Sequence, residues 1–231
     1  MSAARRLLLF TKPAREGRVK TRLIGDLTAA QAAELHAAFL EDLLDRLREG
    51  DFELRIAWAL DEDEAIPEGP AEGLRQQGRD LGERLYSALS EPGAGVVAAL
   101  GSDHPTLPVE LVHRAFGKVE AGADVVLGPA EDGGYYLIAL KAGAVHPRIF
   151  EDVAWSTGRV LATTLERCRE LGLAVELLPE ASDVDTPADL RRLAERMADS
   201  DLGCPRTRDL LQALGLFNIP INIPTETGST A

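Results

Sequence analysis

The sequence predicts an α/β protein with a mainly parallel, Rossmann-like sheet that is covered by helices on both faces. Short apolar runs of strand length alternate with amphipathic helical patterns along the 231 residues. Several helical patterns carry start and stop signals, and no internal repeat interrupts the alternation. Such an order is typical of a three-layer sandwich, in which crossover helices join parallel strands.

The first half of the chain begins with the apolar run RLLLF, a predicted buried strand. Thr28 and Gln31 form the reciprocal capping pattern of a helix start, and we expect Gly50 to end that helix in a left-handed conformation. FELRIAWAL alternates apolar and polar residues, which predicts a half-exposed strand. An acidic loop (61–70), a helix over about 81–89 and the strand VVAAL follow.

The second half continues with the helical pattern LPVELVHRAFGKV and the predicted strands DVVLGP and YYLIAL. Ser156 is expected to cap a helix that runs through Leu171 and ends at Gly172. LAVELLP predicts another strand. Thr186 then caps a helix that begins at Pro187, where proline is tolerated because it lacks only an unused donor.

The length fits a single domain over residues 1–217, closed by a helix at about 206–214, with a mobile tail over 218–231. The formal net charge of -13 argues against a nucleic-acid partner or a polybasic membrane surface. No apolar run reaches the roughly 18 residues of a membrane span, and the start MSAARR does not resemble a signal peptide. We therefore expect a cytoplasmic protein.

A positively charged loop follows the first predicted strand. Ligands of such sheets bind beyond the carboxyl ends of the strands, so the loops after LLLF, VVAAL and VVLGP should share one crevice. Cations here suit phosphate groups, and Gly17 would let the backbone approach a ligand; a solvated loop that balances acidic neighbours is the alternative. The chain has neither a Walker sequence nor G-x-G-x-x-G. The cationic residues are Lys12, Arg15, Arg18, Lys20 and Arg22.

Carboxylates mark two further places at the predicted crevice. The strand VVAAL runs out into Ser102 and Asp103, and a carboxylate beside phosphates suits Mg²⁺ or Mn²⁺. Capping of the next turn is the alternative role for Asp103, and we expect a local hydrogen bond for His104. Asp183 and Asp185 share one face of an extended segment, so either could complete a metal site; for Asp185, capping of the following helix is the alternative.

The stretch GPAEDGGYYLIAL supplies candidate acceptor-binding residues. Glu131 and Asp132 could bind hydroxyls or act as a base beside the glycine pair, although a hairpin turn explains Asp-Gly equally well. Trp155 precedes a predicted helix start, where either anion binding or core packing would suit it. Gly82 in QGRDLGERL stands at another helix start, which could form part of a nucleotide wall.

Taken together, these motifs resemble a bacterial family of GT-A-like transferases, often labelled glycosyltransferase-like. The chain is more distantly similar to 2-phospho-lactate guanylyltransferase and the molybdenum-cofactor nucleotidyltransferases. The resemblance covers about residues 6–216, and His104 stands where the family pattern has a small residue or cysteine. The matching segments are Lys12-Pro13, Gly17, VKTRL (19–23), DLGERL (80–85), GSDHPTL (101–107), GPAEDGGYYLI (128–138), WST (155–157), DVDTPADL (183–190) and CPRTRDLL (204–211).

The resemblance implies the nucleotide-diphospho-sugar transferase (GT-A) fold and a set of roles. Asp103 and Asp185 would hold Mg²⁺ or Mn²⁺, and Lys20, Asp103 and Asp132 would be catalytic. The implied nucleotide-binding residues are Lys12, Gly17, Arg18, Lys20, Arg22, Asp80, Gly82 and Ser102. The implied acceptor-binding residues are Glu131, Asp132, Gly133, Gly134, Tyr135, Trp155 and Ser156.

Two reactions fit such a site. In nucleotidyl transfer, a small phosphorylated or acidic acceptor attacks a nucleoside triphosphate and pyrophosphate leaves. In glycosyl transfer, a nucleotide-sugar donates its sugar, and an acid such as Asp132 deprotonates the acceptor. The sequence favours nucleotidyl transfer, because the basic loop suits the greater charge of a triphosphate. A non-catalytic nucleotide-binding protein is the further alternative.

Overall fold

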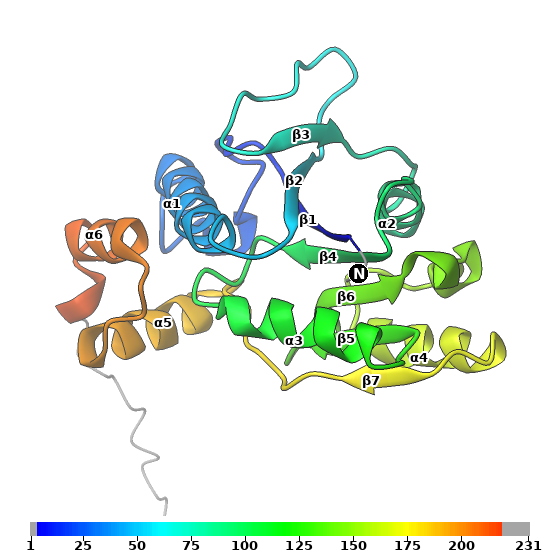
Figure 1. Ribbon diagram of the computed structural model, residues 1–231. Coiled ribbons are helices and arrows are strands. Elements are labelled where there is room, and N and C mark those ends of the chain that lie inside the picture. Colours follow the sequence, from blue (N-terminus) through cyan, green and yellow to red (C-terminus); the bar gives the residue numbers. More distant parts are fainter. Residues whose placement is uncertain (1–3, 219–231) are drawn as a thin grey trace, which may run out of the picture.

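One mixed sheet of seven strands forms the centre of the protein (Figure 1). The structure, a computed structural model, describes residues 4–218. The strands lie in the order β3-β2-β1-β4-β6-β5-β7. Their bounds are β1 Arg5–Thr11, β2 Glu53–Trp58, β3 Glu72–Arg75, β4 Val96–Gly101, β5 Val125–Pro129, β6 Tyr135–Lys141 and β7 Val175–Leu177.

The sheet is mainly parallel, as predicted. β1 pairs in parallel with β2 and β4, β2 with β3, and β5 with β7. Only β6 runs against its neighbours β4 and β5. The carboxyl ends of β1, β4, β5 and β7 therefore meet at the same edge, together with the start of β6.

Helices cover both faces of the sheet (Figure 1). α1 and α3 pack on one face, and α2 and α4 pack on the other. The predicted helix starts at Thr28 and Thr186 are both observed as complete capping boxes. The helix bounds are α1 Ala29–Leu47, α2 Leu81–Leu89, α3 Val109–Glu120, α4 Val160–Glu170, α5 Pro187–Asp199 and α6 Pro205–Ala213.

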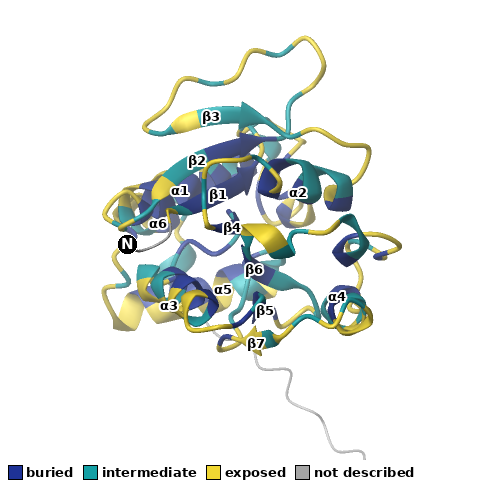
Figure 2. Cartoon of the chain, turned by 45° about the vertical axis from the view of Figure 1, so that its right-hand side comes forward, coloured by how far each residue is buried: buried dark blue, intermediate teal, exposed yellow. Residues whose placement is uncertain are grey.

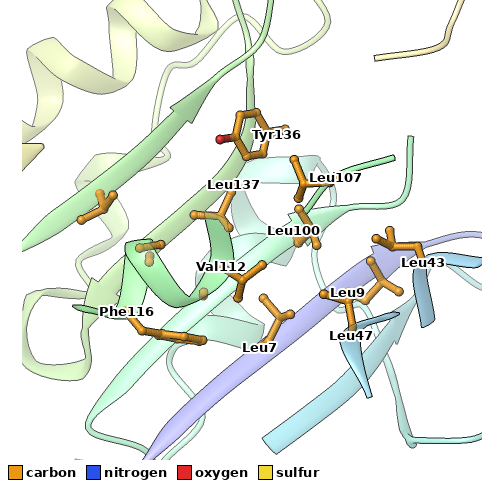
Figure 3. Close-up of a cluster of buried hydrophobic side chains, with 14 of the residues drawn as sticks. Leu7, Leu9, Leu43, Leu47, Leu100, Leu107, Val112, Phe116, Tyr136 and Leu137 are labelled. Atoms are coloured by element: carbon orange, nitrogen blue, oxygen red, sulfur yellow. The ribbon is translucent and has the colours of Figure 1, made fainter. Parts of the chain in front are cut away.

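The central strands are buried on both sides, as parallel strands between helix layers require (Figure 2). Figure 3 shows one of these layers, in which leucines of β1 and α1 meet α3. Leu7 and Leu9 lie between Leu47 of α1 and Phe116 of α3, and all four are at most 1% exposed. This rigid packing fixes the strand ends, from which the site residues project.

A separate hydrophobic cluster joins the C-terminal helices to the N-terminal half of α1. Leu35 and Phe39 of α1 pack against α5, α6 and the short 3-10 helix Thr21–Leu23. This contact brings the segment before α5 close to the loop after β1. The predicted closing helix at about 206–214 corresponds to α6, and most of the predicted tail, 219–231, lies outside the described residues.

Several sequence-based expectations are wrong in detail. Ser156 does not cap α4: its φ is +63°, and the helix begins at Val160 after the N-cap Arg159. Gly50 is not a left-handed cap, because α1 ends at Leu47 and φ at Gly50 is not positive. The alternation in FELRIAWAL does not produce alternating burial, since the last three residues of β2 are all buried.

The edge strand β3 was not predicted. Its four residues, EGLR, carry little β-propensity, and the strand forms through pairing with β2. Within residues 4–218, the helices are all too short or too polar to cross a bilayer.

Candidate active site

Loops at the carboxyl edge of the sheet are joined by hydrogen bonds. The backbone N–H of Val184, before α5, donates to the carbonyl of Asp103, after β4, at 3.2 Å. The ring of His104 also contacts this segment, since its Nδ1 lies 3.0 Å from the carbonyl oxygen of Ser182. Lys20 of the loop after β1 bonds to both segments, so the segments after β1, β4 and β7 form one connected surface.

Lys20 lies at the centre of this surface. Its Nζ donates to Oδ1 of Asp103, to the carbonyl of Val184 at 2.8 Å, and to Oδ1 of Asp185 at 3.2 Å. The Lys20 side chain is only 2% exposed, whereas that of Asp103 is 47% exposed. Burial would raise the pKa of Asp103, but the charge and hydrogen bond of Lys20 hold it below its usual value. The structure thus brings together the two acids expected to bind a metal, with an ammonium group between them.

The described side chains supply only some of the ligands that a divalent cation needs. Among residues 4–218, no group of three or more His, Cys, Asp or Glu side chains could hold a metal ion. Asp103 and Asp185 converge on one point, and Mg²⁺ commonly takes one or two carboxylates together with substrate phosphates and water. These two residues therefore fit a metal that is shared with a nucleotide, provided that the Lys20 ammonium group gives way.

Part of the positive charge of the opening loop is paired with acidic side chains nearby. Arg15 pairs with Asp61 and Glu64 of the acidic loop, and Arg18 lies 3.6 Å from Asp61. For these two arginines the alternative of balancing acidic neighbours is observed. Gly17 has a φ of +70°, and a Cβ there would meet no atom within 4 Å, so its backbone conformation explains this glycine.

Two further cations of the loop, Lys12 and Arg22, are exposed, as Arg18 is. The Arg22 side chain is 63% exposed and lies 3.4 Å from Asp185. Lys12 is exposed at the end of β1, while its carbonyl oxygen lies 3.0 Å from Nε2 of the buried His36. A carbonyl can only accept, so this ring nitrogen carries the proton. Burial lowers the pKa of His36, which keeps the ring neutral.

A pocket of about 280 Å³ opens beside Asp103. Its walls are aromatic and aliphatic, it contains three carboxylates, and none of the described residues that line it is Lys or Arg. It contains predicted site residues from the loops after β4 and β5 and from the segment before α4. The polar and aromatic lining residues are Phe10, Asp103, His104, Asp132, Tyr135, Tyr136, Trp155, Ser156, Thr157 and Asp183.

The glycine pair shapes one wall of this pocket. Oδ1 of Asp132 accepts a hydrogen bond from the N–H of Gly134 at 2.8 Å. Gly133 has a φ of +84°, and a Cβ there would lie 2.3 Å from the carbonyl oxygen of Gly158. Glu131 does not line the pocket, and it accepts a hydrogen bond from Ser182 Oγ at 2.6 Å. Asp132 and Gly134 therefore both form the turn and line the pocket.

Trp155 also lines the pocket, edge-on to Tyr135 with ring centroids 6.4 Å apart. Gly82 packs closely against Trp155, because a Cβ at Gly82 would lie 3.0 Å from Nε1 of Trp155. Asp80 caps α2 by accepting from the N–H of Glu83. Neither Asp80 nor Gly82 lines the pocket. Ser102 is buried at the mouth of β4.

Asp183 joins the pocket as a residue whose role the sequence left open. Burial, followed by the nearby charges of Asp185 and Asp132, raises the pKa of Asp183 to about 6. His104, for which a local hydrogen bond was expected, makes one to Ser182 and packs edge-on to Tyr136. The alternating spacing of Asp183 and Asp185 was the available signal, but only the fold shows that the first faces the pocket and the second faces Lys20.

Comparison with known proteins gives one family and one fold. The family model described as "Uncharacterized protein conserved in bacteria (DUF2064)" matches residues 43–157. A "putative nucleotide-diphospho-sugar transferase" from Desulfovibrio desulfuricans G20 is 32% identical and superposes with a TM-score of 0.85, covering 94% of this chain and 99% of that chain. No curated protein matches by sequence.

More distant solved structures share the fold. A cytidylyltransferase from Leptospira borgpetersenii is 12% identical with a TM-score of 0.57, over 94% of this chain and 98% of that chain. Glucosyl-3-phosphoglycerate synthase from Mycobacterium tuberculosis, solved with Mn²⁺ and uridine diphosphate, is 12% identical with a TM-score of 0.52, over 95% of this chain and 82% of that chain. The predicted GT-A-type fold is confirmed.

Proposed function

The chain belongs to the bacterial DUF2064 family and is a GT-A-like transferase, and on this premise we propose that it transfers a sugar from a nucleotide-diphospho-sugar to a small acceptor with a hydroxyl group. The relative at 32% identity, described as a "putative nucleotide-diphospho-sugar transferase", supports a donor of this class. The more distant structures share only the fold, so they do not decide between sugar and nucleotidyl transfer.

The pocket beside Asp103 carries the proposal. Carboxylates accept hydrogen bonds from sugar hydroxyls, and aromatic side chains pack well on the apolar faces of a sugar ring. A phosphorylated acceptor, in contrast, would need cationic partners, and the residues that line this pocket include none. The proposal therefore departs from the nucleotidyl transfer and the acidic acceptor that the basic loop had favoured.

The donor's diphosphate would bind at the ends of β1 and β4. Lys12 and Arg22 are exposed there, and Lys20 lies between Asp103 and Asp185. A divalent metal held by these two acids would neutralise charge on the diphosphate. Positively charged side chains at this place stabilise the leaving nucleoside diphosphate by charge-assisted hydrogen bonds.

The transfer itself needs a base and an oriented acceptor. The acceptor oxygen forms a bond to the anomeric carbon of the sugar, and the bond from that carbon to the diphosphate oxygen breaks. The acceptor's proton passes to a carboxylate, for which we propose Asp132, because it lines the pocket on the side of the glycine turn. The electron pair of the broken bond leaves with the nucleoside diphosphate.

Nucleotidyl transfer remains the second candidate, because Lys20 and Arg22 belong to the loop that would bind a triphosphate. The two reactions release different products. The purified protein should be incubated with Mn²⁺ and either nucleotide-sugars or nucleoside triphosphates, each with a panel of polyols and sugar phosphates. Acceptor-dependent release of nucleoside diphosphate supports the proposal, whereas acceptor-dependent release of pyrophosphate supports the second candidate. Binding without turnover of any donor would favour a non-catalytic nucleotide-binding protein.

A further inference from the structure

The ammonium group of Lys20 occupies the point on which the two candidate metal ligands converge. We infer that Lys20 is an internal counter-cation that closes the metal site until a nucleotide draws its ammonium group away, so that the metal does not bind alone. This inference rests on the proposed use of a nucleotide, but it does not depend on which group is transferred.

The hydrogen bonds of Lys20 account for the whole ammonium group. Its three donors meet three acceptors: Oδ1 of Asp103, the carbonyl oxygen of Val184 and Oδ1 of Asp185. Nζ also lies 5.4 Å from the centroid of the Phe39 ring, at the distance of a cation–π contact. The closed site is therefore a satisfied state, in which the side chain replaces the positive charge of a metal ion.

The backbone at Lys20 indicates that this placement has a function. Lys20 has φ 46° and ψ 37°, the left-handed conformation, at the start of the 3-10 helix Thr21–Leu23. This conformation is unfavourable by roughly 1–2 kcal/mol for a residue with a side chain, and glycine would adopt it freely. Strained residues of this kind concentrate at binding sites and switching elements.

Opening the site requires a new partner for the ammonium group. A dication and an ammonium group repel each other when both contact the same two carboxylates, so the metal can enter only as Nζ leaves. Lysine has a flexible stem and binds phosphate as a point charge, so the diphosphate of a nucleotide can receive it. The side chains of Asp103 and Asp185 are 47% and 33% exposed, which leaves the solvent side open to the incoming metal.

The experiment measures Mn²⁺ binding without nucleotide, by calorimetry and by thermal shift, in three proteins. Lys20→Met keeps the length and apolar stem of the side chain but removes the charge. Arg22→Ala is the matched control. It removes a positive charge 3.4 Å from Asp185 but leaves the Lys20 ammonium group between Asp103 and Asp185. We expect the Lys20→Met protein to bind Mn²⁺ at least about tenfold more tightly than the wild type, a difference of ~1.4 kcal/mol. Arg22→Ala should stay close to the wild type.

Three results would overturn the inference. One is Mn²⁺ binding by the wild type that is as tight as binding by Lys20→Met. Another is an equal gain in Arg22→Ala, which would indicate a general charge effect. The third is that Mn²⁺ changes neither nucleotide binding nor turnover in any of the three proteins. In that case Lys20 would replace the metal permanently.

A measurement on the wild type covers the case in which Lys20→Met does not fold. The chain has four lysines, so the ammonium signals of ¹⁵N-lysine-labelled protein can be resolved by NMR. The probe is whichever of ADP, GDP, CDP and UDP gives the largest thermal shift. The Lys20 signal should change when this nucleotide and Mg²⁺ are added together, and not with Mg²⁺ alone. A change with Mg²⁺ alone would contradict the inference, while failure of sugar transfer would leave it intact.

Discussion

Oδ1 of Asp185 lies 3.2 Å from Nζ of Lys20, although 165 positions separate the two residues in the chain. The loop after β1 and the segment before α5 meet because α5 and α6 pack on the N-terminal half of α1. Asp103 reaches the same ammonium group from the end of β4. Three elements that are distant in sequence thus converge on one charged centre, and the predictions below test its parts.

Changing Asp103 to asparagine should remove the Mn²⁺-dependent part of nucleotide binding and leave the fold intact. An amide is a poorer ligand than a carboxylate for a hard cation, and the half-exposed side chain tolerates the change. The loss should reach at least about tenfold, or ~1.4 kcal/mol, in calorimetric titrations with Mn²⁺. Asp61→Asn, on the acidic loop, is the control with the same change of charge. Unchanged metal dependence in Asp103→Asn would exclude Asp103 as a ligand.

Changing Asp132 to alanine should reduce turnover by about 10²–10⁴-fold, the usual contribution of a general base. The affinity for nucleotide should change by less than about threefold, under ~1 kcal/mol, because Asp132 lines the pocket rather than the cationic loop. Asp132→Asn is a sharp control, since an amide oxygen can still accept from Gly134. Full activity in Asp132→Asn would reduce this residue to its role in the turn.

Local signals in the sequence predicted much of the fold. The capping box at Thr28 depends on a residue three positions away, and it was predicted correctly, as was the N-cap at Thr186. The four-residue strand β3 was missed, because it exists only through pairing with β2. Ser156 looked like a cap, but its left-handed backbone belongs to the pocket wall rather than to α4.

The candidate site was predictable as a set of residues and not as an arrangement. Asp103 and Asp185 were expected together from the strand ends and from family resemblance, and they do converge. The direction of the Lys20 side chain depends on contacts with α1 and with the segment before α5, which no spacing reveals. For the same reason the pairing of Arg15 with Glu64 could not be foreseen from composition.

Replacing Gly133 by alanine should destabilise the protein by more than ~2 kcal/mol, since it combines backbone strain with a steric clash. Its φ is +84°, and a Cβ there would lie 2.3 Å from the carbonyl oxygen of Gly158. Gly17→Ala is the matched control: the backbone is also left-handed, but the space is open. That variant should lose only ~1 kcal/mol in urea unfolding. Equal losses in the two variants would show that the contact with Gly158 does not constrain the pocket wall.

The contribution of His36 to the free energy of unfolding should fall as the pH drops below about 6.5, the ordinary pKa of histidine. Burial lowers the pKa of His36 in the folded state. Between the two pKa values the unfolded chain therefore binds a proton that the folded chain does not. The slope for this residue is at most about 1.4 kcal/mol per pH unit. His104 is buried with a lowered pKa as well, so it should contribute in the same direction.

The variant His36→Asn isolates the share of His36, because an amide can donate to the Lys12 carbonyl but does not titrate. Urea midpoints at pH 7.5 and 5.5 should differ less in this variant than in the wild type. An unchanged difference would mean that His36 takes up its proton without cost in the folded state.

Arg22 and Arg15 should differ sharply in their effect on nucleotide binding, although both belong to the basic opening loop. Arg22 is 63% exposed and pairs with Asp185 of the candidate site, whereas Arg15 is 38% exposed and pairs with Asp61 and Glu64 of the acidic loop. A charge-assisted hydrogen bond contributes about 1.5–3 kcal/mol, so Arg22→Ala should weaken binding of a nucleoside diphosphate by roughly tenfold or more. A nucleoside monophosphate should lose less, because the contact is with the outer phosphate. Calorimetry at two salt concentrations measures both, and similar small losses for Arg22→Ala and Arg15→Ala would mean that the loop only balances its acidic neighbours.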